Sequence, residues 1–310
     1  MRYLNAKADL TFKRVFGEHP DLVMSLLNAL LPLEADRKIT EIEYLPSEMV
    51  PENPLRKNSI VDVRCKDAQG RHFLVEMQML WSPEFKQRVL FNASKAYVRQ
   101  LDAGNYYHLL QPVYSLNLVN EVFEPELEGF YHHYRLVHVE NSDRIIDGLQ
   151  LVFVELPKFV AHTYGEKKMQ VLWLRYLTEI DERTREVPVE LMENPDIRKA
   201  VSILEESAFT PAQLQGYEDF WDGVSVERTM WLDAKMEGYR TGHQEGHRNG
   251  YQEGHQEGHQ EGLLKGKLEG RLEGQREEKY QIATNLKSQQ IPFEVIARST
   301  GLSIEEISKL

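Results

Sequence analysis

Glycine recurs at every fourth residue in the C-terminal part of the chain, and this repeat limits the possible folds more than any other feature. It begins soon after Trp231, where the composition changes sharply, and glutamate often precedes the glycine. The glycines that follow the period are Gly238, Gly242, Gly246, Gly250, Gly254, Gly258, Gly262, Gly266, Gly270 and Gly274. Such regular self-similarity marks an internal repeat. The repeat therefore separates the body of the chain from a tail.

Two structures are open to the repeat, a helix or a flexible linker. Four helical residues turn by about 400°, so each glycine is displaced by about 40° from the last and the glycines wind around the helix. Ten interior glycines cost about 10 kcal/mol relative to alanine, so an isolated helix of this sequence is weak. Close packing of a partner backbone would compensate. We therefore expect a homo-oligomer that forms through residues 238–274, with a hydrated linker as the alternative.

Composition favours a globular protein of the cytoplasm. The chain has 310 residues, enough for one sizeable core with appendages, and its single cysteine, Cys65, cannot form an internal disulfide. The first residues lack the apolar segment of a signal peptide, and no apolar run approaches the length of a membrane span, so we expect no membrane association. The net charge of -12 argues against a DNA-coating protein, yet residues 51–110 carry nine Lys or Arg and six Asp or Glu.

Hydrophobic periodicity predicts an α/β layer fold followed by helices. Helical spacing occurs in residues 9–31, where Pro20 separates two helices, and in residues 84–102. Residues 165–232 have a mainly helical pattern. Strand-like runs occupy residues 59–65, 71–79, 113–119 and 151–156, and the first two join through residues 66–70 as a β-hairpin.

This pattern divides the chain into four parts. The C-terminal part has hydrophobic spacing typical of three short helices, and Ser303 with Glu306 forms a capping-box pattern. The expected parts are a core in residues 1–160, a helical extension in 161–235, the glycine repeat in 236–275 and a small helical segment in 276–310.

The predicted hairpin places acidic side chains inside apolar strands. Glu76 interrupts the apolar run of residues 73–80, and Asp62 interrupts that of residues 59–63. Side chains two residues apart point to the same face of a strand, so Glu76 and Gln78 project together. If Lys66 pairs with His72 across the turn, Asp62 faces Glu76 directly, whereas a slip of one residue reverses its face.

Two carboxylates beside an amide form a hard-oxygen site that suits Mg²⁺, or Mn²⁺. A cation bound there would activate water and stabilise charge on a phosphodiester. An ordinary half-exposed hairpin with polar residues facing water is the alternative on spacing alone, because short motifs often match by chance.

A series of short motifs follows in order along residues 3–159. They are DLTFKRVFG at 9–17, KNSIVDVR at 57–64, VEMQ at 75–78, Arg88, SKAY at 94–97, QL at 100–101, GNY at 104–106, PVY at 112–114 and ELPKF at 155–159. In these motifs the chain resembles the recombination-promoting nuclease (Rpn) family of the PD-(D/E)xK superfamily. The tail is similar to the tails of that family as well, in the glycine repeat and in residues 300–303.

The resemblance implies a restriction-endonuclease-like mixed sheet flanked by helices, and metal-dependent cleavage of DNA. Asp62 and Glu76 match the two metal-binding acids of that superfamily. Gln78 stands where many members have the catalytic lysine, and an amide carries no charge. Candidate replacements for that charge are Lys57, Lys13 and Arg88, and Asp9 is a candidate for an additional metal contact.

Cations near the hairpin are the candidates for binding DNA. The expected phosphate contacts are Arg64, Lys86, Arg88 and Lys13. Two alternatives to a nuclease remain at this point. One is a degenerate nuclease fold that acts as a DNA-binding or interaction module, and the other is an assembly protein whose function lies in the tail.

Overall fold

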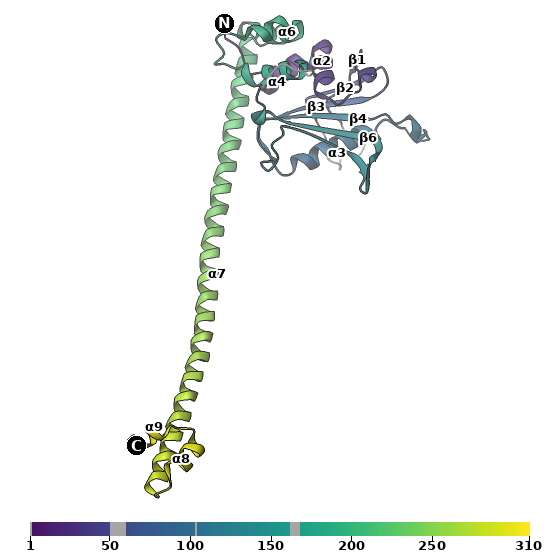
Figure 1. The fold of residues 1–310 in the computed structure, drawn as a ribbon. Coiled ribbons are helices and arrows are strands. Elements are labelled where there is room, and N and C mark those ends of the chain that lie inside the picture. The colour runs from purple at the N-terminus through teal and green to yellow at the C-terminus, as the bar shows by residue number, and fades with distance from the viewer. Residues whose placement is uncertain (1, 50–59, 103, 162–167) are drawn as a thin grey trace. The chain divides into compact units, whose positions relative to one another are not determined.

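A computed structural model describes residues 2–49, 60–102, 104–161 and 168–310 of the chain. The chain forms two compact units, Met1–Met230 and Trp231–Leu310. The first unit contains a mixed sheet with helices on both of its faces (Figure 1).

The sheet has six strands in the order β1-β2-β3-β4-β6-β5. β3 pairs in parallel with β4 and β4 in parallel with β6, whereas the other neighbours are antiparallel. The strands are β1 (Ile42–Tyr44), β2 (Val63–Asp67), β3 (His72–Gln78), β4 (Val113–Val119), β5 (Tyr131–His138) and β6 (Asn141–Glu155). The expected mixed sheet with flanking helices is confirmed.

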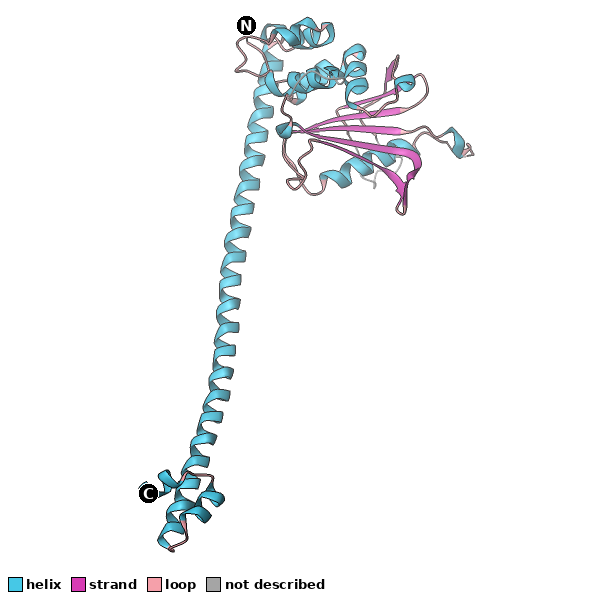
Figure 2. Cartoon of the chain, in the orientation of Figure 1, coloured by secondary structure: helices cyan, strands magenta, loops and turns pink. Residues whose placement is uncertain are grey.

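Helices cover the two faces of this sheet unequally (Figure 2). One face carries the main core, in which Val63, Val75 and Leu116 pack with the buried sides of five helices. These helices are α1 (Asp9–Gly17), α2 (Pro20–Leu30), α4 (Lys168–Glu179), α5 (Val189–Glu193) and α6 (Pro195–Ile203). The other face packs Leu74 against a single helix, α3 (Phe85–Val98), through Ala93. The side chains of the even-numbered residues of β3 therefore face α3.

The hairpin has the predicted register, but its strands begin and end elsewhere. Lys66 pairs with His72 and Val63 with Val75, which confirms the register. β2 starts four residues later than expected because Ile60 and Val61 turn away to meet residues 47 and 48. β2 also continues to Asp67, whose carboxylate accepts hydrogen bonds from the amides of residues 69 and 71 and closes a tight turn. Gly70 in that turn has a φ of +80°, which favours glycine.

Elsewhere the buried elements are predicted better than the exposed ones. The strand over residues 113–119 and the division of residues 9–31 at Pro20 are both confirmed. β6 begins ten residues before the expected strand, because its first half is exposed and lacks an apolar pattern. The edge strands β1 and β5 were not predicted, for the same reason. Short 3₁₀ turns occupy Ala35–Arg37, Tyr107–Leu109, Leu156–Lys158 and Glu206–Ala208.

A single long helix, α7 (Pro211–Ser288), includes all ten repeat glycines. Its first turns pack Tyr217 with Leu4 and Ala8 in the first unit. In the second unit, residues 231–279 are exposed throughout, and Ala283 packs with α8 (Phe293–Thr300) and α9 (Ile304–Lys309). The predicted capping box of Ser303 and Glu306 begins α9. Among the described helices, none is long and apolar enough to cross a membrane.

Candidate active site

Asp62 and Glu76 meet at the end of the hairpin, on the face that α3 covers. Glu76 lies on β3, and Asp62 immediately precedes β2. The register of the hairpin, continued by one pair beyond Val63 and Val75, places the two acids opposite each other. The Asp62 carboxylate accepts a hydrogen bond from the Met77 amide at 2.7 Å. Met77 lies two residues beyond Val75, the last residue of β3 that pairs with β2, so the Asp62 carboxylate accepts the hydrogen bond where the ladder between β2 and β3 has ended. The bond fixes the position of the first acid.

Both carboxyl groups are difficult to ionise in this position. The pKa of Asp62 is raised to about 6, mainly by burial and in part by the nearby negative charge of Asp9, whereas the hydrogen bond from the Met77 amide and the positive charges of Lys13 and Arg88 act in the opposite direction. Burial also raises the pKa of Glu76, to which the charge of Asp62 adds. The charge of Asp62 therefore disfavours ionisation of Glu76, and a cation bound by both acids would relieve this repulsion.

Asn92 on α3 is a member of the site that the sequence did not reveal. Its side-chain nitrogen donates to Oε1 of Glu76 at 2.9 Å, and both side chains are buried. This hydrogen bond lowers the pKa of Glu76 and so opposes the effect of burial. The only signal in the sequence is a polar residue beside the apolar stripe of α3, next to Val89 and Ala93.

Gln78 connects the strand to a cation on α3. Its Oε1 accepts a hydrogen bond from the Arg88 guanidinium at 2.5 Å, and its amide nitrogen donates to the carbonyl of Leu80. The same guanidinium nitrogen lies 3.7 Å from Oε2 of Glu76. Gln78, which stands where a lysine was expected, thus holds the Arg88 guanidinium beside the acids.

The α1 helix contributes a second pair of charges. Lys13 and Asp9 form an ion pair of 2.7 Å one turn apart, and both side chains are about half exposed at 46%. Their charges act on Asp62, so both predicted residues lie near the acids.

The donor set suits a hard divalent cation. Mg²⁺ commonly binds through one or two carboxylates and keeps several waters, and Asp62 and Glu76 supply two carboxylates of raised pKa. No group of three His, Cys, Asp or Glu suited to a metal occurs in the described part of the chain. A direct contact of Asp9 with a metal therefore stays a prediction.

The other predicted DNA contacts are dispersed. Lys57 lies outside the described residues. The structure does not bring Lys86 to the acids: its ammonium pairs with Glu124 and lies 5.0 Å from the ring centroid of Phe123. The reason is that Lys86 precedes Arg88 by two residues, which places the two side chains on different sides of α3. Arg64 lies on β2, two residues beyond Asp62.

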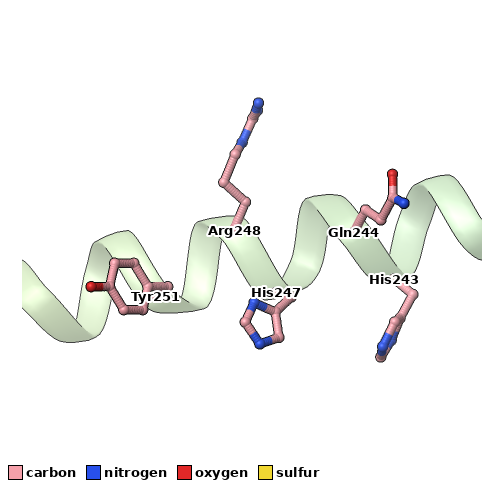
Figure 3. Close-up of a pocket in the computed structure, with 5 residues that line it drawn as sticks. All are labelled: His243, Gln244, His247, Arg248 and Tyr251. Carbon is pink, nitrogen blue, oxygen red and sulfur yellow. The ribbon is translucent and has the colours of Figure 1, made fainter.

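The tail carries a different cluster of polar groups. Figure 3 shows His243 and His247 pointing to the same side of α7, with Tyr251 one turn further along and Arg248 on the opposite side. The hollow that they line is a shallow surface of a single helix. It contains two of the four ligands that a closed zinc site requires.

Comparison with known proteins agrees with this geometry. No curated protein matches the chain, and no solved structure matches it. A family model does match residues 6–224, which include the whole sheet, all the helices around it and the site residues on α1, β3 and α3. The match covers more than half of the chain. The chain therefore belongs to the PD-(D/E)XK nuclease family transposases.

Proposed function

We propose that this protein is a metal-dependent DNA endonuclease that acts in recombination or in the movement of mobile elements. The family match implies a nuclease related to mobile elements. The observation that carries the proposal is the pair of acids with raised pKa values, Asp62 and Glu76, which lie together at the end of the hairpin beside Arg88. The resemblance of the sequence to recombination-promoting nucleases supports the more specific assignment, and a cytoplasmic location accords with it.

Asp62 and Glu76 are the residues that would hold the cation, Mg²⁺ or Mn²⁺. A divalent cation there lowers the pKa of water and neutralises charge on the phosphodiester. The Met77 amide holds one carboxylate and Asn92 holds the other, so neither acid needs to reorganise when it binds. Their raised pKa values mean that ionisation of both carboxyl groups is costly, and a bound divalent cation would offset this cost.

Arg88 takes the place of the missing lysine in this proposal. Gln78 orients its guanidinium, which is 48% exposed and can therefore reach a phosphate from solvent. Lys13 supplies a second positive charge from α1, and Asp9 restrains it through their ion pair. Arginine binds a phosphate through two parallel hydrogen bonds, which would hold the scissile group in place.

Plasmid cleavage tests the proposal. The wild type should cut supercoiled DNA with Mg²⁺ or Mn²⁺ and not with EDTA. Asp62→Asn and Glu76→Gln, which keep the shape of each side chain, should lose cleavage and keep DNA binding. Asp21→Asn is the control. Asp21 lies on α2 and pairs with Lys199 on α6, and these two helices cover the face of the sheet opposite α3.

The main alternative is a degenerate nuclease that binds DNA without cutting it, which the neutral Gln78 makes worth testing. Wild type that binds DNA and never cleaves it with either metal would support that alternative. Cleavage that survives Glu76→Gln would show that the two acids are not the active site.

We also infer that α7 pairs with a second copy of itself. Residues 231–279 are exposed, and a Cβ atom added at any of the ten repeat glycines would meet nothing within 4 Å in the chain. No contact with the described part of the chain therefore requires glycine at these positions, whereas close approach of a partner helix would require it. Pairing would place two nuclease sites in one assembly, which suits the cutting of both strands.

A further inference from the structure

A cavity lies at the carboxyl ends of β3 and β4, just beyond the residues of the active site. Its volume is about 430 Å³, which is within the range of about 300 to 1,000 Å³ for small-ligand sites. The first unit supplies all of its walls, from the segment before α1, the ends of the two strands, the segment after α4 and the first part of α7. β3 and β4 are parallel, and open α/β sheets bind ligands outside the carboxyl ends of parallel strands.

Gln78 joins this cavity to the acid pair. Its side-chain nitrogen donates to the carbonyl of Leu80 at 2.5 Å, and its backbone carbonyl accepts from the amide of Asn120 at 2.8 Å. Leu80 and Asn120 both line the cavity. Leu80 lies four residues beyond Glu76, which is at most about 14 Å along an extended chain. Successive phosphates of one strand advance by about 3.4 Å along B-DNA, so this reach corresponds to a few nucleotides.

Two cations that line the cavity have side-chain donors to spare. The Lys7 ammonium is half-buried and the Arg183 guanidinium is exposed, and neither forms a hydrogen bond or an ion pair within the described ranges of the chain. The two acids beside them already have donors, because Glu182 accepts from the Tyr217 hydroxyl and Asp181 accepts from the backbone amide of Arg183. A phosphate would satisfy both cations.

The neutral groups of the cavity suit a nucleobase. Trp221 supplies an indole, which Phe220 supports with 5.3 Å between the ring centroids, and aromatic faces stack with any base. The side-chain amide of Asn120 makes no hydrogen bond to another described residue. Asn5 is only 9% exposed, and its Oδ1 accepts from the Lys7 amide at 3.0 Å. Side-chain amides carry both donors and acceptors, as the edges of bases do.

We propose that this cavity binds one unpaired nucleotide of the DNA, a few positions from the bond that is cut. Its base lies against Trp221 and Asn120, and its phosphate lies at Lys7 and Arg183. The proposal rests on the proposed function, since it takes DNA to lie at the acids. A base has to leave the duplex stack to enter the cavity, and this costs least for a base that is already unpaired. The protein should therefore prefer DNA that carries an unpaired nucleotide.

The experiment measures the affinity of the full chain for fluorescein-labelled duplexes by anisotropy, in EDTA so that no cutting occurs. One duplex is fully paired, another has a bulge of one adenine nucleotide, and another has an abasic site in place of that nucleotide. The two bulged duplexes differ only in the base, so their ratio of affinities reports the base itself. We expect the wild type to bind the adenine bulge about tenfold more tightly than the abasic bulge, as one stacked base would give.

The variants separate the base from the phosphate. Asn120→Ala and Trp221→Leu should bring the ratio close to one, whereas Trp221→Phe keeps an aromatic ring and should retain most of it. Lys7→Gln should weaken binding to both bulged duplexes alike, because both keep the phosphate. All of these variants should bind the fully paired duplex as the wild type does, which a loss of the fold would not allow. Lys38→Gln, an exposed cation on another part of the first unit, is the matched control for Lys7→Gln.

The outcomes separate the cavity from the nuclease. Wild type that cuts plasmid DNA but binds the two bulged duplexes equally overturns the nucleotide site and leaves the nuclease proposal standing. Wild type that prefers the adenine bulge and never cuts DNA supports the site and counts against the nuclease. A ratio that survives both Asn120→Ala and Trp221→Leu overturns the assignment to this cavity. Calorimetric titration with deoxyadenosine monophosphate distinguishes the source of the nucleotide: tight binding of the free nucleotide, together with equal affinity for the two bulges, would overturn a site for DNA.

Discussion

The side-chain amide of Asn92 on α3 lies 2.9 Å from Oε1 of Glu76 on β3, and it is the buried contact that joins the helix to the acid pair. A hydrogen bond to a charged group contributes more than one between neutral groups, in the range of about 1.5 to 3 kcal/mol. Asn92 therefore helps to set the pH at which Glu76 ionises.

Replacing Asn92 should move the pH dependence of cleavage. In Asn92→Leu, Glu76 loses its donor, so its pKa rises further and the acidic limb of the pH–rate profile shifts to higher pH by about one unit. Asn92→Asp should shift it in the same direction because it adds a second negative charge. An unshifted limb in both variants, measured at saturating Mg²⁺, would mean that Glu76 does not govern the profile.

Asp62 should make metal binding depend on pH. With a pKa of about 6 it is largely protonated below that value, so proton and metal compete and the apparent affinity for Mg²⁺ should fall about tenfold per pH unit below about pH 6. Calorimetric titration with Mg²⁺ or Mn²⁺ measures this change in affinity. The titrations run from about pH 5 to about pH 8, a range that brackets the pKa of Asp62. Asp62→Asn should bind weakly at every pH.

The Asp62 carboxylate should destabilise the metal-free fold at neutral pH. Its folded pKa of about 6 is above the ordinary value of 3.8, so its stability contribution is complete below about pH 4 and is lost as the pH rises through 6. In EDTA, Asp62→Asn should therefore be more stable than the wild type at pH 7, by about 3 kcal/mol at most, and not at pH 4. Urea unfolding at the two pH values gives the comparison.

Arg88 and Gln78 should act as a unit. Arg88→Gln removes the positive charge beside the acids, and we expect a loss in kcat of about 100-fold or more. Gln78→Lys alone places two cations together at the position of the present hydrogen bond. The double variant Gln78→Lys/Arg88→Gln should therefore recover part of the activity, whereas equal activity of Arg88→Gln and wild type would remove Arg88 from the mechanism.

Glu155, at the end of β6, should support the fold rather than the reaction. It is fully buried, which by itself raises its pKa, but Lys158, the amides of Phe123 and Glu124, and His132 together lower that pKa to about 2. Glu155→Gln should cost about 3 to 5 kcal/mol at pH 7, because it leaves the Lys158 ammonium without its carboxylate and with only the carbonyls of Glu124 and Leu127. Since the folded pKa is depressed, the difference from wild type is complete above about pH 4.5 and shrinks as the pH falls toward 2.

The glycines of α7 should matter for assembly and not for the helix itself. Gly250→Leu, Gly254→Leu and Gly258→Leu together should raise helix propensity and yet weaken self-association, because the larger side chains hold a partner helix away. The matching alanine triple variant keeps the surface small and should associate more like the wild type. Sedimentation analysis that finds one assembly state for all three proteins would exclude the glycines as an interface.

The pairing of Asp62 with Glu76 could be predicted from sequence because a strand has a period of two. Once Lys66 pairs with His72, every other pair of the hairpin follows, and both acids fall on one face. The buried strand at residues 113–119 was predictable for a similar reason, since its side chains have to be apolar on both faces. Exposed strands such as β5 have no such constraint, so their sequence carries no comparable signal.

Tertiary structure alone decided which cations serve the acids. Lys86 and Arg88 contribute equally to the charge of the sequence, but two residues along a helix turn by about 200°, and only Arg88 faces Gln78. Asn92 joined the site, and Lys13 came near it, because α3 and α1 pack on the sheet through their apolar sides and carry these polar residues with them. Local sequence determined the acids because their spacing is fixed by the backbone, whereas their charge partners depend on contacts between elements distant in the chain.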